Sequence, residues 1–484
     1  MAADLLRDDL VRARRVDALE GDAPSVVAHR FDVEIAKALC FDPFVAVSDP
    51  LDPGLVRALD AYVDERLDDL VGLVRDLVAF DTVSVDLAPG SEHTKNEEGA
   101  LQEMVGGVLA ELGAEVDQWE PDPASLRDHP MMPPWHHWRG RPITVGTVRG
   151  QGGGRSLIVN GHIDVVSPEP TTMWATPPFA ARREGDWLYG RGAGDMKAGL
   201  VAFVGAVRGL IALGCRPLAR VQLQCVVEEE CTGNGALACV AAGHTADAAV
   251  VTEPTSGGIQ HSQVGVLWFS VRVAGRPDHA GDAPEGQNAI EATFPIVRAL
   301  RDLEADLNEA PPAPYDGYPH PINLNVGMIR GGDWPSTVAG ESVTHCRLAL
   351  FPGENPNELK SRVEHTVATA ASEDPLLAGF EVEVEYDGFA CRGYTLDSEA
   401  PLIGALAAAR ERLTGEAPTV FASTATTDAR AFQLYGDTPA VCFGPHGEGI
   451  HGVDERVYLP SVTEAAQVLG LFIGDWCGLA PALP

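Results

Sequence analysis

Short apolar-rich runs that alternate with helical patterns constrain the fold of this chain most strongly. Runs such as SLIVNG (156–161) and RVQLQCVV (220–227) lie between segments in which apolar residues recur at helical spacing. Strands that carry apolar side chains on both faces belong to a sheet that is covered on both sides by helices. The pattern therefore predicts an α/β fold with a mixed, largely parallel sheet.

The order of the remaining segments predicts how the chain is divided. One long amphipathic helix is expected over residues 55–80, and residues 120–142 are typical of a long proline-broken loop. From about residue 262 the order becomes strand, helix, strand, strand, helix and strand, which favours a ferredoxin-like α+β layer. We therefore expect an N-terminal extension at 1–53, an α/β domain formed by 54–261 and 390–484, and an inserted domain at 262–389.

The charge balance argues against two classes of partner. Acidic residues outnumber basic ones by 70 to 35, and the formal net charge of −35 disfavours nucleic acid and anionic membrane surfaces. The sequence shows no run of 18 apolar residues and no secretory signal pattern. Its nine cysteines form no CxxC pair, and most lie in apolar runs, which favours buried, reduced thiols. We expect a cytoplasmic protein that binds neither nucleic acid nor membranes.

Histidine and carboxylate side chains follow the apolar runs, where α/β sheets place their functional groups. Imidazole nitrogen and carboxylate oxygen, without a thiolate pair, are ligands for zinc, manganese or cobalt. Each residue has a simple alternative, because a His-x-Asp pair occurs by chance, a glutamate run is usually solvated, and an aspartate can cap a helix. Their joint occurrence favours a metal site. The residues are His162, Asp164, Asp195, Glu228, Glu229, Glu230, Glu253 and His451.

Six stretches of the chain resemble one family of enzymes. They are SLIVNGHIDVV, LYGRGAGDMKAGL, VVEEECTGNGAL, VVTEPT, RPDHAG and HGVDERV. In this order they are similar to the zinc-dependent family of aminoacylase, acetylornithine deacetylase, succinyl-diaminopimelate desuccinylase and glutamate carboxypeptidase, from about residue 60 to the C-terminus. The resemblance implies a di-zinc aminopeptidase-like catalytic domain, with an inserted lid and dimerisation domain, in a homodimer. The N-terminal extension has no counterpart in it.

The resemblance also implies two divalent metal ions, with Zn²⁺ expected and Co²⁺ or Mn²⁺ as alternatives. Asp195 would bridge both ions, His162 and Glu253 would complete one site, and Glu230 and His451 would complete the other. Two ions roughly 3.5–4 Å apart can share a hydroxide and polarise the substrate carbonyl that it attacks.

Catalytic and positioning roles follow from the same resemblance. Glu229 is expected to be the general base, and Asp164 to hydrogen-bond the far ring nitrogen of His162. His279 would reach the active site of the neighbouring subunit and stabilise the oxyanion, and the alternative is an exposed turn histidine. Glu228 is expected to be structural.

The family's substrate-binding residues are matched only in part. Ser336 or Thr337 stands where relatives carry an asparagine, and Ala349 where they carry an arginine, which leaves recognition of an α-carboxylate open. Arg392 is a candidate for a substitute charge or an ordinary surface residue, and Gly444 is a candidate for close approach to the substrate. An aromatic loop could line the pocket or pack on its own domain; it comprises Trp135, His136, His137 and Trp138. Asp428 is expected to order the active-site wall.

These observations predict a metal-dependent hydrolase of linear amide bonds. Its substrate would be a small molecule, an amine or amino acid that carries an N-acyl or N-formyl group. A dipeptidase or exopeptidase would use the same site and differ only in its pocket. A metal-binding protein without catalysis is the remaining alternative, although Glu229 and all five expected ligands are present.

Overall fold

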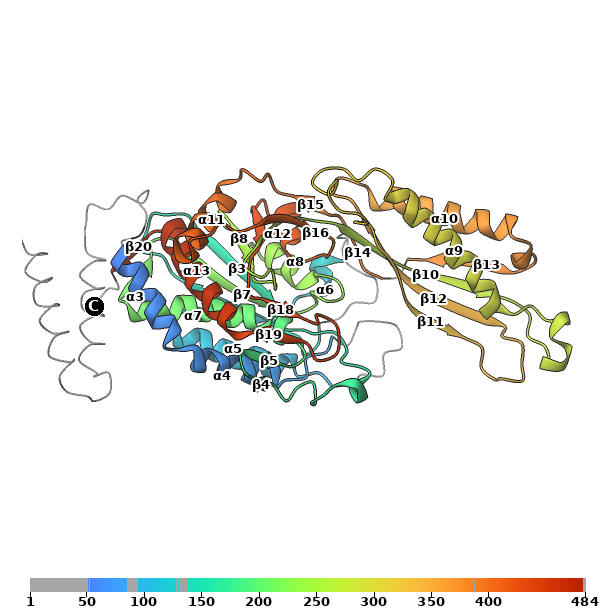
Figure 1. The fold of residues 1–484 in the computed structure, drawn as a ribbon, viewed down its shortest axis with the longest axis horizontal. Coiled ribbons are helices and arrows are strands. Elements are labelled where there is room, and N and C mark those ends of the chain that lie inside the picture. Colours follow the sequence, from blue (N-terminus) through green and yellow to red (C-terminus); the bar gives the residue numbers. More distant parts are fainter. Residues whose placement is uncertain are drawn as a thin grey trace, which may run out of the picture.

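The computed structural model describes residues 51–84 without Asp52, 95–127, 129, 138–386 and 388–481. Nearly all of the predicted N-terminal extension, and residues 135–137 of the aromatic loop, therefore lie outside the described residues. Figure 1 shows an elongated molecule in which a large sheet with its helices lies beside a smaller sheet that extends away from it.

The large sheet has nine strands and confirms the predicted α/β class. Its central strands β7, β3, β8 and β17 run parallel to one another, whereas β1 and β2 on one side and β9 and β15 on the other pair antiparallel with their neighbours. The strand order is β1 (Glu115–Trp119), β2 (Ile143–Val148), β7 (Val221–Val226), β3 (Leu157–His162), β8 (Ala249–Val251), β17 (Ala440–Cys442), β9 (Ile259–Gln263) and β15 (Tyr394–Thr395), and β16 (Val420–Ser423) pairs with β9.

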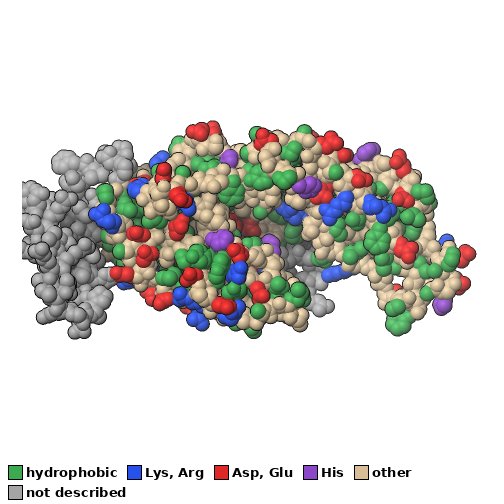
Figure 2. All heavy atoms as spheres, viewed as in Figure 1, with side chains coloured by type: hydrophobic (Ala, Val, Ile, Leu, Met, Phe, Trp, Pro, Cys, Tyr) green, Lys and Arg blue, Asp and Glu red, His purple; other side chains and the backbone are tan. Residues whose placement is uncertain are grey.

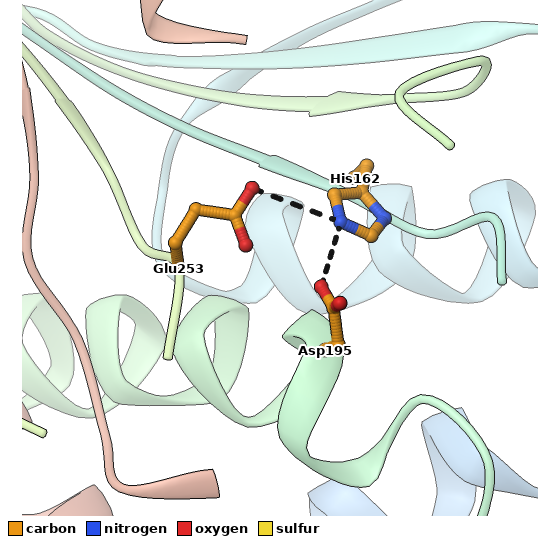
Figure 3. Close-up of side chains that lie close together, drawn as sticks. All are labelled: His162, Asp195 and Glu253. Carbon is orange, nitrogen blue, oxygen red and sulfur yellow. Dashed lines mark hydrogen bonds and ion pairs between the residues drawn. The ribbon is translucent and has the colours of Figure 1, made fainter. Parts of the chain in front are cut away.

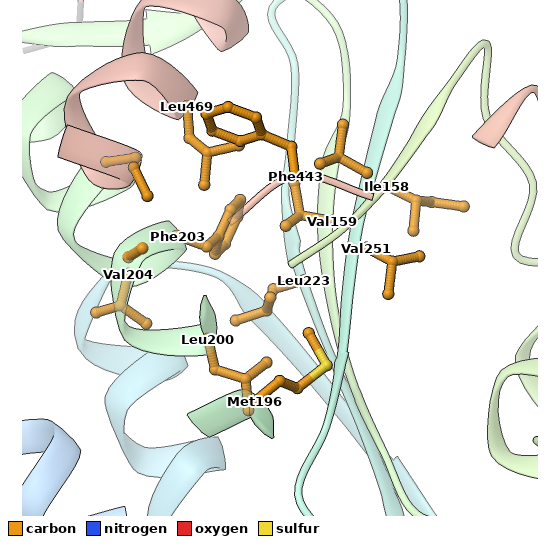
Figure 4. Packing of buried hydrophobic residues seen from close by; sticks show 14 of the residues in the cluster. Ile158, Val159, Met196, Leu200, Phe203, Val204, Leu223, Val251, Phe443 and Leu469 are labelled. Atoms are coloured by element: carbon orange, nitrogen blue, oxygen red, sulfur yellow. The ribbon is translucent and has the colours of Figure 1, made fainter. Parts of the chain in front are cut away.

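Helices cover both faces of this sheet because successive strand residues point to opposite sides. Val159 faces Phe203 and Leu223 on one side, whereas Ile158 and Val251 point to the other (Figure 4). One face carries α7 (Ala198–Ala212) and α13 (Leu459–Cys477), which pack against each other, and the other carries α8 (Asn234–Ala241) and α12 (Ala429–Tyr435).

The small sheet has the topology expected of a ferredoxin-like layer. Its strand order is β11 (Leu324–Gly331), β12 (Glu341–Leu350), β10 (Gly265–Ala274) and β13 (Glu381–Glu385), with all pairs antiparallel. The short strand β14 (Ala390–Cys391) also pairs antiparallel with β10. Helices α9 (Ala289–Leu307) and α10 (Pro356–Glu373) pack on it and on each other (Figure 1). The exact domain boundaries remain a prediction.

The expected helix over residues 55–80 is wrong in one respect, because the structure divides it into α3 (Pro53–Asp64) and α4 (Leu67–Val78). Both helices pack against α7, so the apolar periodicity continues across the polar turn at Glu65 and Arg66 and does not reveal the bend. The predicted loop 120–142 contains the short helix α6 (Pro123–Leu126). The other elements used below are α5 (Glu98–Glu111), α11 (Pro401–Thr414), β4 (Arg182–Glu184), β5 (Trp187–Tyr189), β18 (Gly447–Glu448) and β19 (Arg456–Tyr458).

Among the described residues, the cysteines agree with the sequence-based expectation except at one position, and Cys40 lies outside them. Seven of them are free and buried. Cys215 differs because it is disulfide-bonded. The local sequence around a cysteine does not reveal whether a second cysteine lies close enough to bond with it.

The surface matches the composition. Figure 2 shows acidic and basic side chains interspersed over this face of the molecule rather than separated into single-sign areas. In the part of the chain that the structure describes, we find no helix with the length and apolar character that a bilayer crossing requires.

Candidate active site

The first group of candidate metal ligands is built on neighbouring strand ends. His162 is the last residue of β3, and Glu253 follows β8, which runs parallel to β3 and pairs with it. Asp195 comes from the turn Ala193–Lys197 before α7. The His162 Nε2 atom lies 3.2 Å from Asp195 Oδ1 and 3.9 Å from Glu253 Oε1, and Figure 3 shows the three side chains pointing toward one another. One ligand atom from each residue lies within 4.8 Å of the others, so this group could hold a metal ion.

A second group shares Asp195 with the first. The other carboxylate oxygen of Asp195, Oδ2, lies 3.3 Å from His451 Nε2, which is also 3.0 Å from Glu230 Oε2. These three residues form another set of ligand atoms within 4.8 Å of one another. His451 adopts a positive φ of 61°, a backbone conformation that residues other than glycine rarely take. Such residues cluster at functional sites. Asp195 therefore contributes one carboxylate oxygen to each group, and its role as a bridging ligand stays a prediction.

The electrostatics of the two groups favour a bound cation. Burial raises the pKa of Glu253, and also that of Glu229, well above the usual range, and neighbouring carboxylates add to both effects. Burial would also raise the pKa of Asp195, but hydrogen bonds with His162 and His451 hold it well below its usual range. A buried excess of carboxylates with two imidazoles is a donor set that suits divalent ions such as zinc or manganese.

Asp164 positions its neighbours differently from our expectation. The His162 Nδ1 atom lies 2.9 Å from the main-chain carbonyl oxygen of Asp164, whereas the nearest carboxylate oxygen is 3.8 Å away, too far for a hydrogen bond. The carboxylate instead accepts the main-chain N–H groups of Glu229, at 3.3 Å, and Glu230, at 3.2 Å. Burial raises the pKa of Asp164 to about 8. Asp164 thus joins the strand that carries His162 to the turn that carries Glu229 and Glu230.

Glu228, at the start of that turn, is part of a buried ionic network, which agrees with its expected structural role. Its carboxylate pairs with Arg141 and accepts a hydrogen bond from Thr232 Oγ1 at 2.8 Å. The Arg141 Nε atom also lies 2.6 Å from Glu98 Oε2 on α5, and the three charged side chains are fully buried. Arg141 lies near the end of the predicted loop 120–142, so this part of the loop is tied to the glutamate turn through Glu228. Sequence reasoning did not identify Arg141 or Glu98.

The candidate base Glu229 lies between the two metal groups and a buried arginine. Arg430, fully buried on α12, places Nη1 3.9 Å from Glu229 Oε1 and donates from Nη2 to the carbonyl oxygen of Thr232 at 3.2 Å. Asp428 is buried nearby, and neither of its carboxylate oxygens has a hydrogen-bond partner among the described residues. Burial raises the pKa of Asp428 to about 6. Its position agrees with a role in the wall of the site.

The remaining predicted residues do not join either metal group. His279 is exposed on the inserted part, where Ala280 N donates to the Ser336 carbonyl oxygen at 3.0 Å, so the candidate residues His279 and Ser336 are neighbours. Arg392 is exposed directly after β14. Trp138 of the aromatic loop is buried in the main core, which favours packing over pocket lining for this residue.

Gly444 is buried against the backbone that carries a candidate ligand. A Cβ atom at this position would lie 2.5 Å from the carbonyl oxygen of Glu253, so only glycine fits the close approach of these two segments. The glycine also lines a cavity of about 300 Å³ with Ser256 and His446. A direct contact with substrate stays a prediction.

His446, Ser256 and Glu448 form a hydrogen-bonded series that superficially resembles a hydrolytic triad. The His446 Nδ1 atom lies 2.7 Å from Ser256 Oγ, and Nε2 lies 3.2 Å from Glu448 Oε1. A serine nucleophile also requires N–H donors for the oxyanion. The N–H groups of Ser256, Gly257 and Gly258 all donate to main-chain carbonyls instead. This series therefore gives no support to serine hydrolase chemistry.

The fold and the paired ligand groups define a hydrolase class with two adjacent candidate metal sites. Residues 158–475 match the family model described as Peptidase family M20/M25/M40, which covers more than half of the chain. The chain belongs to this family, as the resemblance of its motifs predicted, and it is an amide-bond hydrolase.

Individual relatives agree with this assignment. The chain is 29% identical over 450 residues to the N-formyl-4-amino-5-aminomethyl-2-methylpyrimidine deformylase of Halalkalibacterium halodurans, covering 88% of this chain and 99% of that protein. Among solved structures it is similar to the di-peptidase Dug1p from Saccharomyces cerevisiae, with a TM-score of 0.73, 13% identity and coverage of 87% and 98%. It is also similar to the Bacillus subtilis YXEP protein, described as a dinuclear metal binding peptidase, with a TM-score of 0.54, 16% identity and coverage of 85% and 98%.

Proposed function

We propose that this protein is a dinuclear metal deformylase that hydrolyses the formamide of a small aminomethyl-substituted pyrimidine. The products would be formate and the free amine. The observation that carries the proposal is the nearly full-length similarity to a relative named as a deformylase of this substrate, on a chain whose candidate ligands meet in two groups that share Asp195. We include a cytoplasmic location in the proposal, which the seven free, buried cysteines support, whereas the disulfide at Cys215 counts against it.

The substrate class is supported by what replaces the expected carboxylate-binding residues. Ala349 on β12 is fully buried, and it pairs with Val266 of β10, so no cation is available at the position where relatives carry an arginine. Ser336 is a neutral residue on an exposed loop. An aminomethylpyrimidine formamide has no α-carboxylate, and its recognition would not require a cation at either position. A dipeptide or N-acyl amino acid would lose this contact.

In the proposed mechanism, His162, Asp195 and Glu253 would hold one divalent ion, and Asp195, Glu230 and His451 would hold the other. Bound ions of this kind polarise an amide carbonyl and make water more acidic. Glu229 accepts a proton from the attacking water and transfers it to the leaving nitrogen, so that the C–N bond breaks and the amine leaves neutral. Asp164 accepts the main-chain N–H of Glu229, and Arg430 Nη1 lies 3.9 Å from the Glu229 carboxylate, so both contacts help to position the base.

We also propose that a second copy of the chain completes the site through His279. This histidine is exposed on the inserted part and belongs to neither metal group. Within the described residues, β11 pairs only with β12 and forms an edge of its sheet. Exposed apolar side chains include Ile329 on β11, Trp334 three residues after it, and Phe294 on α9, which contacts β11. An edge strand with unpaired backbone groups and apolar neighbours favours pairing with another chain.

The proposed reaction is tested by measuring formate release from N-formyl-4-amino-5-aminomethyl-2-methylpyrimidine by the zinc-loaded protein. N-acetyl and N-succinyl amino acids and a set of dipeptides serve as competing substrates in the same assay. We expect kcat/KM for the formamide to exceed that for every carboxylate-bearing substrate by at least about a hundredfold, because a mispaired polar group in a substrate pocket costs several kcal/mol. Cleavage of dipeptides without release of formate would refute the proposal.

A further inference from the structure

The buried carboxylate of Glu455 belongs to neither metal group, but it connects the chain segment that carries His451 to the segment that carries Asp195. Glu455 lies four residues after His451 and is fully buried. Its Oε2 atom lies 2.5 Å from Arg191 Nη1 and accepts the N–H of Gly192 at 3.1 Å. Its Oε1 atom accepts the N–H groups of Gly194 at 2.9 Å and Asp195 at 3.0 Å. All four donors lie between residues 191 and 195, in or directly before the turn that carries the shared residue Asp195.

Other contacts hold the same two segments together. Arg191 Nη2 donates to the carbonyl oxygen of Gly452 at 3.1 Å, which places a second link between the Asp195 turn and the His451 loop. Gly194 packs so closely that a Cβ atom there would lie 2.8 Å from Ile450 Cδ1. The Glu455 carboxylate is therefore at the centre of a contact between two segments that are more than 250 residues apart in sequence.

The two metal groups depend on this contact to different degrees. His162 and Glu253 lie at the ends of β3 and β8, whose parallel pairing fixes their separation without help from Glu455. His451 lies outside any strand, in the segment between β18 and β19, and has a positive φ of 61°. Its position relative to Asp195 is set by the loop that Glu455 holds.

We infer that Glu455 is a positioning residue for the second metal group, Asp195, Glu230 and His451. The carboxylate contacts the main-chain N–H of Asp195 and not its candidate ligand oxygens. It acts by fixing the main chain of Asp195 against the loop of His451. This inference rests on the proposed dinuclear function, and it predicts that the loss of Glu455 weakens one metal site more than the other. A carboxylate with a purely structural role would affect both sites equally.

The test is a cobalt titration of the full-length protein after removal of its metals. Co²⁺ binding is followed by visible absorption, and we expect two binding events per chain in the wild type. The Glu455→Gln variant retains the shape of the side chain. Its amide NH₂ group cannot accept the main-chain N–H hydrogen bonds that the carboxylate accepts. Because outer contacts of this kind typically change metal affinity about 10–100-fold, we expect one event to weaken by that factor while the other weakens much less.

Ligand variants identify which event is affected. His451→Ala removes a ligand of the second group only, and His162→Ala removes a ligand of the first. We expect Glu455→Gln to weaken the remaining event in the His162→Ala background and to have little effect in the His451→Ala background. Equal effects in both backgrounds would show that Glu455 is only structural, and unchanged affinities would overturn the inference outright.

Controls separate this result from misfolding and from failure of the proposed function. Glu448→Gln alters an acidic residue of the same segment that pairs with Arg456 at the surface, and it should leave both events unchanged. If Glu455→Gln does not fold, Glu455→Asp keeps the charge but shortens the side chain, and the same selective weakening is expected. A wild-type protein that binds no Co²⁺ would refute the dinuclear function, whereas two tight events in both the wild type and the variant would refute only the role of Glu455.

Discussion

The His162 Nδ1 atom lies 2.9 Å from the main-chain carbonyl oxygen of Asp164, only two residues further along the chain. A carbonyl oxygen can only accept, so Nδ1 carries a proton in this contact. The Nε2 atom faces Asp195 Oδ1 at 3.2 Å, and it is the ring nitrogen that would bind a metal ion. The carboxylate of Asp164 is thereby free to hold the main chain of the Glu229–Glu230 turn. One residue therefore orients a candidate ligand and places the candidate base.

Replacement of the candidate base should separate metal binding from turnover. In Glu229→Gln the amide cannot accept the proton of the attacking water, and we expect kcat to fall by about two to four orders of magnitude. The two metal groups do not include Glu229, so the metal content per chain, measured by elemental analysis, should equal that of the wild type. Unaltered turnover in Glu229→Gln would contradict the assignment of the base.

The metal groups could be predicted from the sequence because each candidate ligand lies in or beside a recognisable motif. His162 ends a buried strand and Glu253 follows one, and a parallel sheet brings such strand ends to one edge. The roles of Arg141, Arg191 and Glu455 could not be predicted. Each is a charged side chain whose burial depends on which distant turns meet, and local residue patterns do not encode this.

Two features of the fold, the bend between α3 and α4 and a sheet of short strands, were also missed from the sequence. Apolar spacing predicted the helical character of residues 55–80 but not the bend, because both halves face the same helix, α7. The sheet formed by β18, β19, β5 and β4 was missed because its strands are only two or three residues long. Sequence periodicity needs longer segments to give a signal. A residue pattern also cannot show that His162 contacts the main-chain carbonyl of Asp164 and not its carboxylate.

If His279 acts in the partner's active site, two inactive variants should restore activity in a mixed dimer. We expect His279→Ala to keep its metal ions and lose most of its turnover, as expected for the removal of an oxyanion donor. In a dimer of one His279→Ala chain and one Glu229→Gln chain, one site has both residues intact and the other has neither. A randomly mixed equal population should therefore regain about a quarter of the wild-type rate.

The matched control for this experiment is His345→Ala, which alters another histidine of the inserted part that belongs to neither metal group. This variant should retain wild-type turnover on its own. Mixed dimers that stay inactive after unfolding and refolding together would show that His279 does not act across subunits. Full activity of His279→Ala alone would exclude a catalytic role for it.

The buried network around Arg141 should be a major determinant of stability. Arg141 pairs with Glu98 and Glu228, and all three side chains are fully buried. Removing one partner of a buried ionic network leaves uncompensated charge, which typically costs about 3–5 kcal/mol of unfolding free energy. We therefore expect Arg141→Met to lower the free energy of unfolding by this amount in urea titrations, and to lower Tm.

Arg149→Met breaks the exposed pair of Arg149 with Glu115 and should leave stability unchanged. A triple variant, Arg141→Met with Glu98→Gln and Glu228→Gln, removes every charge and should recover part of the loss. If Arg141→Met is as stable as Arg149→Met, the network does not hold the glutamate turn in place.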